Sequence, residues 1–137
     1  TQALRMRREA AREVMRFLET FEPRLVGPVL NGTADTHSPV NLHVFDDSPE
    51  RVATYLLDRG IAFETRAHTF RLDRQRNAEF PVFLFDADGV AVDVTVFPQD
   101  ALRQAPLDRT DERPQQRASL AALDALLADD TGRENWE

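Results

Sequence analysis

Cysteine is absent from this 137-residue sequence, and because all 17 basic residues are arginine, lysine is absent too. The lack of cysteine excludes disulfides, thiolate catalysis and zinc–thiolate sites. The lack of lysine excludes a P-loop lysine, a Schiff base and a lysine nucleophile. No apolar run approaches the roughly 20 residues of a membrane-spanning helix, and the N-terminus has no signal-peptide apolar core. We therefore expect a cytoplasmic protein with no membrane partner.

The chain is long enough for one domain with a real core, since 42% of its residues are hydrophobic. We expect a single domain over residues 1–137. The first residue is Thr1, so the sequence is also compatible with a piece of a longer protein. The net charge of -7 argues against general nucleic-acid binding, because proteins that neutralise phosphates usually carry a basic face.

Periodicity of the apolar residues predicts the elements of secondary structure. Helical spacing, with caps and breakers at the ends, predicts helices over residues 2–21, 49–60 and 118–128. Alternation or short apolar runs predict strands over residues 25–30, 40–45, 63–72, 80–85 and 90–97. The polar segment 98–117 is expected to be a long surface connection. This order predicts an α+β fold with one mixed β-sheet and helices mainly on one face.

The segment from Leu30 to Phe45 contains an apolar run, a Gly32-Thr33 turn, a short polar connection and a second apolar strand. It resembles the signature of the DNA polymerase beta-like nucleotidyltransferase superfamily. The resemblance covers about residues 25–97, and the helices predicted on either side of this range are compatible with the same fold. It implies a nucleotidyltransferase-like fold in which a glycine and a small hydroxyl residue at a helix start receive the triphosphate. It also implies that two acids on the next strand, and a third from a later strand, bind catalytic magnesium.

The sequence departs from this pattern at the metal-binding positions. Asn41 and His43 stand where the resemblance implies two acids, and Asp93 matches the third acid. Magnesium prefers hard oxygen ligands, so Asn41 is a weak ligand and His43 suits transition metals better. The alternative to metal binding is a structural role for both residues. In that interpretation, Asp93 is a polar residue on a solvated face, and His43 is a partly buried histidine whose ring packs and makes one hydrogen bond.

The resemblance implies nucleotide-phosphate contacts for Gly32, Thr33 and Ser38. Glycine lets backbone approach a phosphate, and a hydroxyl and amides at a helix start can donate to its oxygens. The alternative is a plain tight turn with an N-cap. Because strands alternate, we expect Asn41, His43 and Asp93 to share one face and to surround a common space beside Gly32 and Thr33.

Arginines gather in two segments of the second half of the chain. Those between Arg66 and Arg76, with His68, could form an anion-binding rim to which the long connection adds Arg103, Arg109, Arg113 and Arg117. We favour the alternative that these arginines are solvated and paired with interleaved acids, namely Asp73, Glu79, Asp108, Asp111 and Glu112.

These features favour a degenerate nucleotidyltransferase-like domain that binds a nucleotide or a protein without efficient metal-dependent transfer. One alternative is an active nucleotidyltransferase that uses Mg²⁺ and a nucleoside triphosphate (NTP), with Asp93 as its catalytic acid, helped by His43 or by an acid such as Asp35. Another is an antitoxin-like interaction module that uses its terminal helices to form a homo-oligomer or to bind a protein partner. Magnesium-dependent nucleotide binding and a transfer product would separate these three hypotheses.

Overall fold

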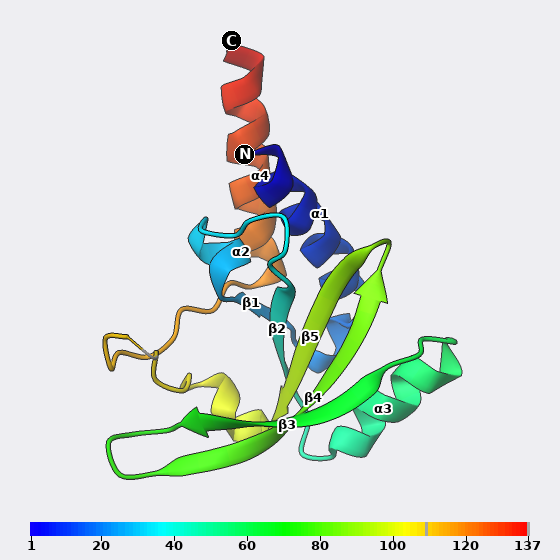
Figure 1. Cartoon of the computed structure of the whole chain (residues 1–137), viewed down its shortest axis with the longest axis vertical. Helices are drawn as coiled ribbons and strands as arrows, with labels where there is room; N and C mark the ends of the chain where they lie inside the picture. Colours follow the sequence, from blue (N-terminus) through cyan, green and yellow to red (C-terminus); the bar gives the residue numbers. More distant parts are fainter. Residues whose placement is uncertain (109, 137) are drawn as a thin grey trace.

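The computed structural model describes residues 1–108 and 110–136, with side chains described up to residue 130 (Figure 1). Its helices are α1 (Gln2–Phe17), α2 (Pro28–Asn31), α3 (Pro49–Asp58) and α4 (Leu120–Trp136), with 3-10 turns at Glu19–Phe21 and Gln99–Leu102. Its strands are β1 (Arg24–Val26), β2 (Val40–Phe45), β3 (Glu64–Arg71), β4 (Asn77–Ala87) and β5 (Val90–Phe97).

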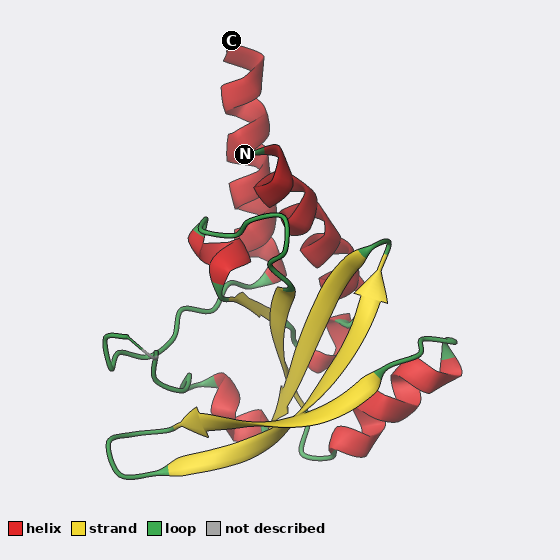
Figure 2. Cartoon of the chain, viewed as in Figure 1, coloured by secondary structure: helices red, strands yellow, loops and turns green. Residues whose placement is uncertain are grey.

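The five strands form one sheet in the order β1-β2-β5-β4-β3. Strands β2 and β5 run parallel, and the other neighbours run antiparallel (Figure 2). A parallel pair needs a crossover connection, and here α3, β3 and β4 together make it. The predicted α+β fold with one mixed sheet is confirmed.

The two faces of the sheet differ in chemistry because side chains alternate along each strand. On one face, six side chains of β2 and β5 are at most 1% exposed: Val40, Leu42, Val44, Val92, Val94 and Val96. They form one hydrophobic cluster with Met15 of α1, Leu56 of α3 and Leu123 of α4. The helices therefore cover this face, as the sequence predicts.

The opposite face, called the open face below, carries Asn41 and His43 of β2 and Asp93 and Thr95 of β5. It is partly covered by the strap, which comprises residues 103–108 and 110–117 of the long connection. The Leu107 amide donates to the Arg71 carbonyl at 2.8 Å, and Ala118 exchanges two backbone hydrogen bonds with Leu25. The strap is thus attached to both edges of the sheet, through Leu107 to β3 and through the residue that follows it, Ala118, to β1. No described helix is long and apolar enough to cross a lipid bilayer.

The prediction of a strand over residues 25–30 is wrong beyond Val26. Gly27 turns the chain with φ 77° and ψ -159°, a conformation that only glycine adopts readily, and Pro28 then occupies the first turn of α2. Proline is favoured there because its missing N–H has no partner at a helix start. The helix predicted over 118–128 begins at Leu120 and continues to Trp136, and the one predicted over 2–21 ends as α1 at Phe17.

Gly27 and Gly89 allow a matched test of the turn before α2. Both have positive φ, but an added Cβ at Gly27 would lie 2.8 Å from Asn41 Nδ2, whereas one at Gly89 meets nothing within 4 Å. We expect Gly89→Ala to cost about 1 kcal/mol of unfolding free energy and Gly27→Ala to cost about 2–4 kcal/mol. Urea denaturation measures both, and equal losses would contradict the close approach of Gly27 to Asn41.

Candidate functional site

A pocket of about 530 Å³ lies on the open face, between the sheet, the start of α2 and the strap. Its polar lining comes from several segments: Asn31, Asn41, His43, His68, Asp93, Thr95, Asp108, Thr110 and Gln115. Its apolar lining includes Val26, Phe70 and Leu107, and Gly27 and Pro28 border it at the start of α2. The pocket thus combines amides, carboxylates and two histidines with a hydrophobic wall.

The parallel pairing of β2 with β5 positions the central residues of this pocket. Asn41 is the register partner of Asp93, and His43 is the partner of Thr95. Paired strands lie about 4.8 Å apart, so residues directly opposite each other on one face are neighbours. The structure therefore brings Asn41, His43 and Asp93 together around one space, as strand alternation predicts.

Gly32, Thr33 and Ser38 lie outside the lining of this pocket. The prediction that Gly32-Thr33 opens a helix is wrong, because Gly32 ends α2 in a left-handed conformation. The amides of Gly32 and Thr33 both donate to the Pro28 carbonyl at 3.0 Å, so both are satisfied within the protein. Ser38 closes a local turn with Asp35, whose carboxylate accepts from the Ser38 hydroxyl. The helix start beside the pocket is instead Gly27-Pro28.

His43 is 2% exposed and is surrounded by aromatic rings and one arginine. Its ring centroid lies 4.6 Å from that of Phe97 and 5.9 Å from that of Phe70. Arg117 Nε donates a hydrogen bond to His43 Nδ1 at 3.1 Å. Burial, and secondarily the positive charge of Arg117, lower the pKa of His43 to about 3, so the ring is neutral near pH 7. This arrangement corresponds to the alternative of a packed histidine with one hydrogen bond.

Asp93 is half-buried, and this burial raises the pKa of its carboxyl, while nearby His68 lowers it. Its register neighbour Asn41 is a neutral amide beside the backbone of Gly27. Asp35, the acid considered as an additional metal ligand, is an exposed residue of the loop before β2 and does not line the pocket. Asp93 and Asp108 are therefore the two carboxylates of the pocket lining.

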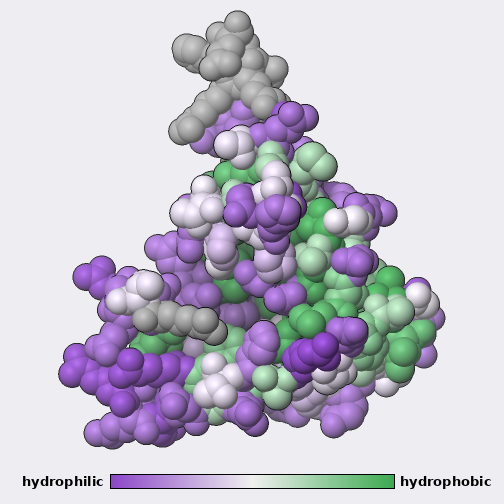
Figure 3. Space-filling model, viewed as in Figure 1, coloured by the Kyte–Doolittle hydropathy of each residue, from purple (hydrophilic) through white to green (hydrophobic). Residues whose placement is uncertain are grey.

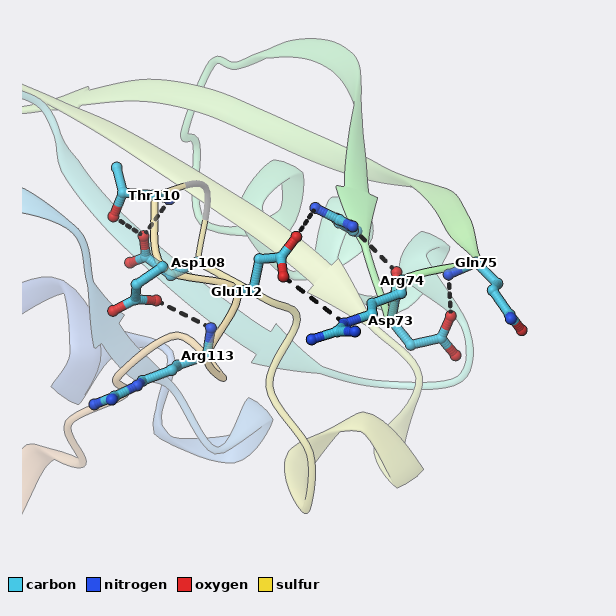
Figure 4. A network of polar contacts seen from close by, with 9 residues as sticks. Asp73, Arg74, Gln75, Asp108, Thr110, Glu112 and Arg113 are labelled. Atoms are coloured by element: carbon cyan, nitrogen blue, oxygen red, sulfur yellow. Dashed lines mark hydrogen bonds and ion pairs between the residues drawn. The ribbon is translucent and has the colours of Figure 1, made fainter.

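The arginines of the predicted rim are mostly paired with acids. Arg71 Nη1 lies 3.1 Å and Arg74 Nε 3.8 Å from the carboxylate of Glu112, which links the β3–β4 turn to the strap (Figure 4). Arg76 Nε lies 2.7 Å from Asp73. In the lower left of Figure 3, this charged end of the molecule forms a continuous hydrophilic surface. Paired, solvated arginines are thus confirmed for these positions, and Arg109 lies outside the described residues.

Among the described arginines of the strap, Arg117 differs by its burial and by its contact with His43, and the sequence suggested it only as one of several rim arginines. It is half-buried, its guanidinium carbon lies 4.8 Å from the Phe45 ring centroid and 5.3 Å from that of Phe97, and it contacts His43. The only local signal was an arginine just before the apolar start of α4. Nothing in that signal points to a histidine 74 positions earlier.

The donor set of the pocket does not fit a pair of magnesium ions. Two-metal phosphoryl transfer needs several carboxylates that can neutralise the charge of both cations. Asp93 is the one carboxylate among the three positions, Asn41 is neutral, and His43 already accepts a hydrogen bond from a cation. Among the described residues, no group of three or more histidines or acids is placed to hold a metal ion.

No family model matches this chain, and no curated protein or solved structure matches it.

The pKa of His43 predicts how stability depends on pH. Between about pH 6.5, the ordinary value, and pH 3, the unfolded chain takes up a proton at His43 that the folded protein does not. Stability from this residue is therefore fully present above pH 6.5 and is lost as the pH falls toward 3. We expect His43→Asn to flatten the fall in unfolding free energy between pH 7 and pH 4.5, measured by urea denaturation.

The exposed His37 supplies the control for that measurement. His37→Asn should keep the wild-type dependence on pH. If His43→Asn and wild type lose the same unfolding free energy between pH 7 and pH 4.5, His43 is not held neutral in the folded protein.

Asp93 predicts an effect of the opposite sign. Because burial raises its pKa in the folded state, the folded protein binds more protons at this carboxyl than the unfolded chain, so stability falls as the pH rises above 3.8. We expect Asp93→Asn to raise the unfolding free energy at pH 7, by less than about 1 kcal/mol because the carboxyl is half-exposed. Thermal melting would measure the gain. Asp58→Asn, at the exposed end of α3, should change little, and a lower melting temperature for Asp93→Asn would contradict the assignment.

Proposed function

We propose that the chain is a degenerate nucleotidyltransferase-like domain that binds a nucleotide in the open-face pocket without efficient metal-dependent transfer. The observation that carries the proposal is the register of β2 and β5, which sets Asn41 beside Asp93. These neighbouring positions are two of the three at which the resemblance implies metal-binding acids. Here the pair consists of one amide and one carboxylate.

Binding is supported by the composition of the pocket. Asn31, Asn41 and Gln115 offer amide donors and acceptors, and Phe70 and Leu107 offer apolar surface. A pocket of about 530 Å³ falls within the range of small-molecule sites, roughly 300–1,000 Å³. Such a mixture suits the base and sugar of a nucleotide better than its phosphates, because the lining contains Asp93 and Asp108 and no arginine.

Loss of transfer is supported by the same residues. A magnesium ion between Asn41 and Asp93 would receive one full negative charge from the protein at these positions, and His43 is held by Arg117. In phosphoryl transfer, metal ions neutralise charge that develops on the phosphates, and one carboxylate holds them poorly. The residues of this chain would therefore bind and orient a nucleotide and leave its phosphate bonds intact.

The proposal predicts binding without chemistry. Titration calorimetry with ATP, GTP, CTP and UTP should show that at least one nucleotide binds wild type with similar affinity with and without Mg²⁺. Mass spectrometry should find no transferred nucleotidyl group on the protein or on added acceptors. Asp93→Ala should weaken binding several-fold, whereas Asp58→Ala should not.

Asn41→Asp supplies the complementary test. Two carboxylates on paired strands repel each other, so this variant should be less stable without metal and should regain stability with Mg²⁺. A wild-type transfer activity that Asp93→Ala abolishes would replace the proposal with an active nucleotidyltransferase. Absence of nucleotide binding in wild type, together with no response of Asn41→Asp to Mg²⁺, would favour the interaction module.

A further inference from the structure

Arg117 occupies a position that the backbone fixes. The next residue, Ala118, donates to the Leu25 carbonyl and accepts from the Leu25 amide, which joins the end of the strap to β1. The Arg117 guanidinium then lies over the rings of Phe45 and Phe97 on the open face. Its Nη1 donates to the Ala101 carbonyl at 2.6 Å and its Nε to His43 Nδ1 at 3.1 Å. Backbone pairing, ring contacts and two hydrogen bonds together determine its orientation.

The hydrogen bond from Arg117 determines which nitrogen of His43 carries the proton. A guanidinium only donates, so His43 Nδ1 must accept with its lone pair, and the proton of the neutral ring is on Nε2. Burial lowers the pKa of Arg117, but only to about 10, so the guanidinium stays charged at neutral pH. The arrangement also has a cost, because Arg117 Nη2 is buried without a hydrogen-bond partner among the described residues.

These contacts leave His43 no lone pair for a metal ion. A histidine ligand binds metal through an unprotonated nitrogen, yet Nδ1 accepts from Arg117 and Nε2 is protonated. Arg24, the register partner of His43 on β1, is a second cation close enough to Arg117 to affect its pKa. The two arginines make this end of the open face positive, which disfavours a bound cation further.

We propose that Arg117 is a positioning residue that makes His43 a fixed, neutral hydrogen-bond donor, so that this position of the pocket binds an acceptor oxygen of the ligand in place of a metal ion. His43 lines the pocket, and its Nε2–H is the donor that the ring retains. The acceptor that fits is a carbonyl, hydroxyl or phosphoryl oxygen. The part of this inference that concerns a ligand oxygen rests on the proposed function. The neutral state of His43 and its inability to bind a metal ion do not depend on the proposed function.

Histidine nitrogen NMR tests the state of His43 without any ligand. In ¹⁵N-labelled wild type, the His43 signals, identified by their loss in His43→Asn, should report a protonated Nε2 and an unprotonated Nδ1. They should stay unchanged from pH 8 to pH 5. A protonated Nδ1, or a midpoint near pH 6.5 for His43, would overturn the inference.

Arg117→Met tests the role of the guanidinium, because methionine keeps apolar volume between the rings but cannot donate. We expect His43 to lose its single proton position, its pKa to rise toward the ordinary value, and Zn²⁺ affinity at His43 to increase about tenfold over wild type. Arg103→Met, an exposed arginine earlier in the strap, is the matched control and should leave all three unchanged. If Arg117→Met does not fold, Arg117→Lys should retain the Nε2-protonated state, since lysine also donates.

Addition of metal-free ATP to labelled wild type separates this inference from the proposed function. A shift of the His43 Nε2–H signal on binding supports both. If His43 is neutral with the proton on Nε2 but its signals do not respond to any nucleotide, nucleotide binding is rejected. The inference that His43 does not bind metal ions then still holds. Zn²⁺ binding at His43 in wild type that equals binding in Arg117→Met rejects the role of Arg117, whichever ligand the pocket takes.

Discussion

The parallel pairing of β2 with β5 is the constraint on which the site depends. Six side chains on the helix-covered face, from Val40 to Val96, are almost fully buried along these two strands. A slip of one residue in either strand would turn its buried side chains to the open face and its polar ones into the core. At roughly 1.5 kcal/mol or more for each buried valine, such a slip is strongly disfavoured. The hydrophobic core therefore fixes Asn41 beside Asp93.

Periodicity in the sequence was sufficient for the regular elements and for the open face. Strands β2 and β5 were predicted with their observed bounds, because apolar and polar residues alternate over five positions in each. The four residues of α2 are too few to show helical spacing, and the apolar Val29 and Leu30 fit a strand equally well. Gly27 and Gly32 lie five positions apart, and local sequence does not show which of them stands at the start of a helix. Only the fold shows that Gly27 precedes α2 and that Gly32 ends it.

The contact of Arg117 with His43 could not be predicted from local sequence. The strap carries several arginines in similar polar surroundings, and most arginines near it pair with acids such as Glu112. Arg117 differs because the next residue, Ala118, is hydrogen-bonded to Leu25 through the backbone. This pairing places the Arg117 side chain over the aromatic rings of the open face. That placement depends on β1 and on the closure of the whole strap. A tertiary interaction across 74 residues leaves no periodic trace in the sequence.

The pocket lining contains two carboxylates, whereas two arginines lie close to His43, and these charges constrain any ligand. Around His43, the guanidinium groups of Arg117 and Arg24 are positive, whereas Asp93 and Asp108 contribute negative charge to the lining. A free triphosphate beside both carboxylates would be repelled, and a cation at His43 would be repelled by the arginines. A bound molecule is therefore expected to direct acceptor oxygens toward His43 and its donor groups toward Asp93. The half-buried Asp93 carboxylate costs folding energy, so a donor from the ligand would offset a penalty that the protein alone leaves in place.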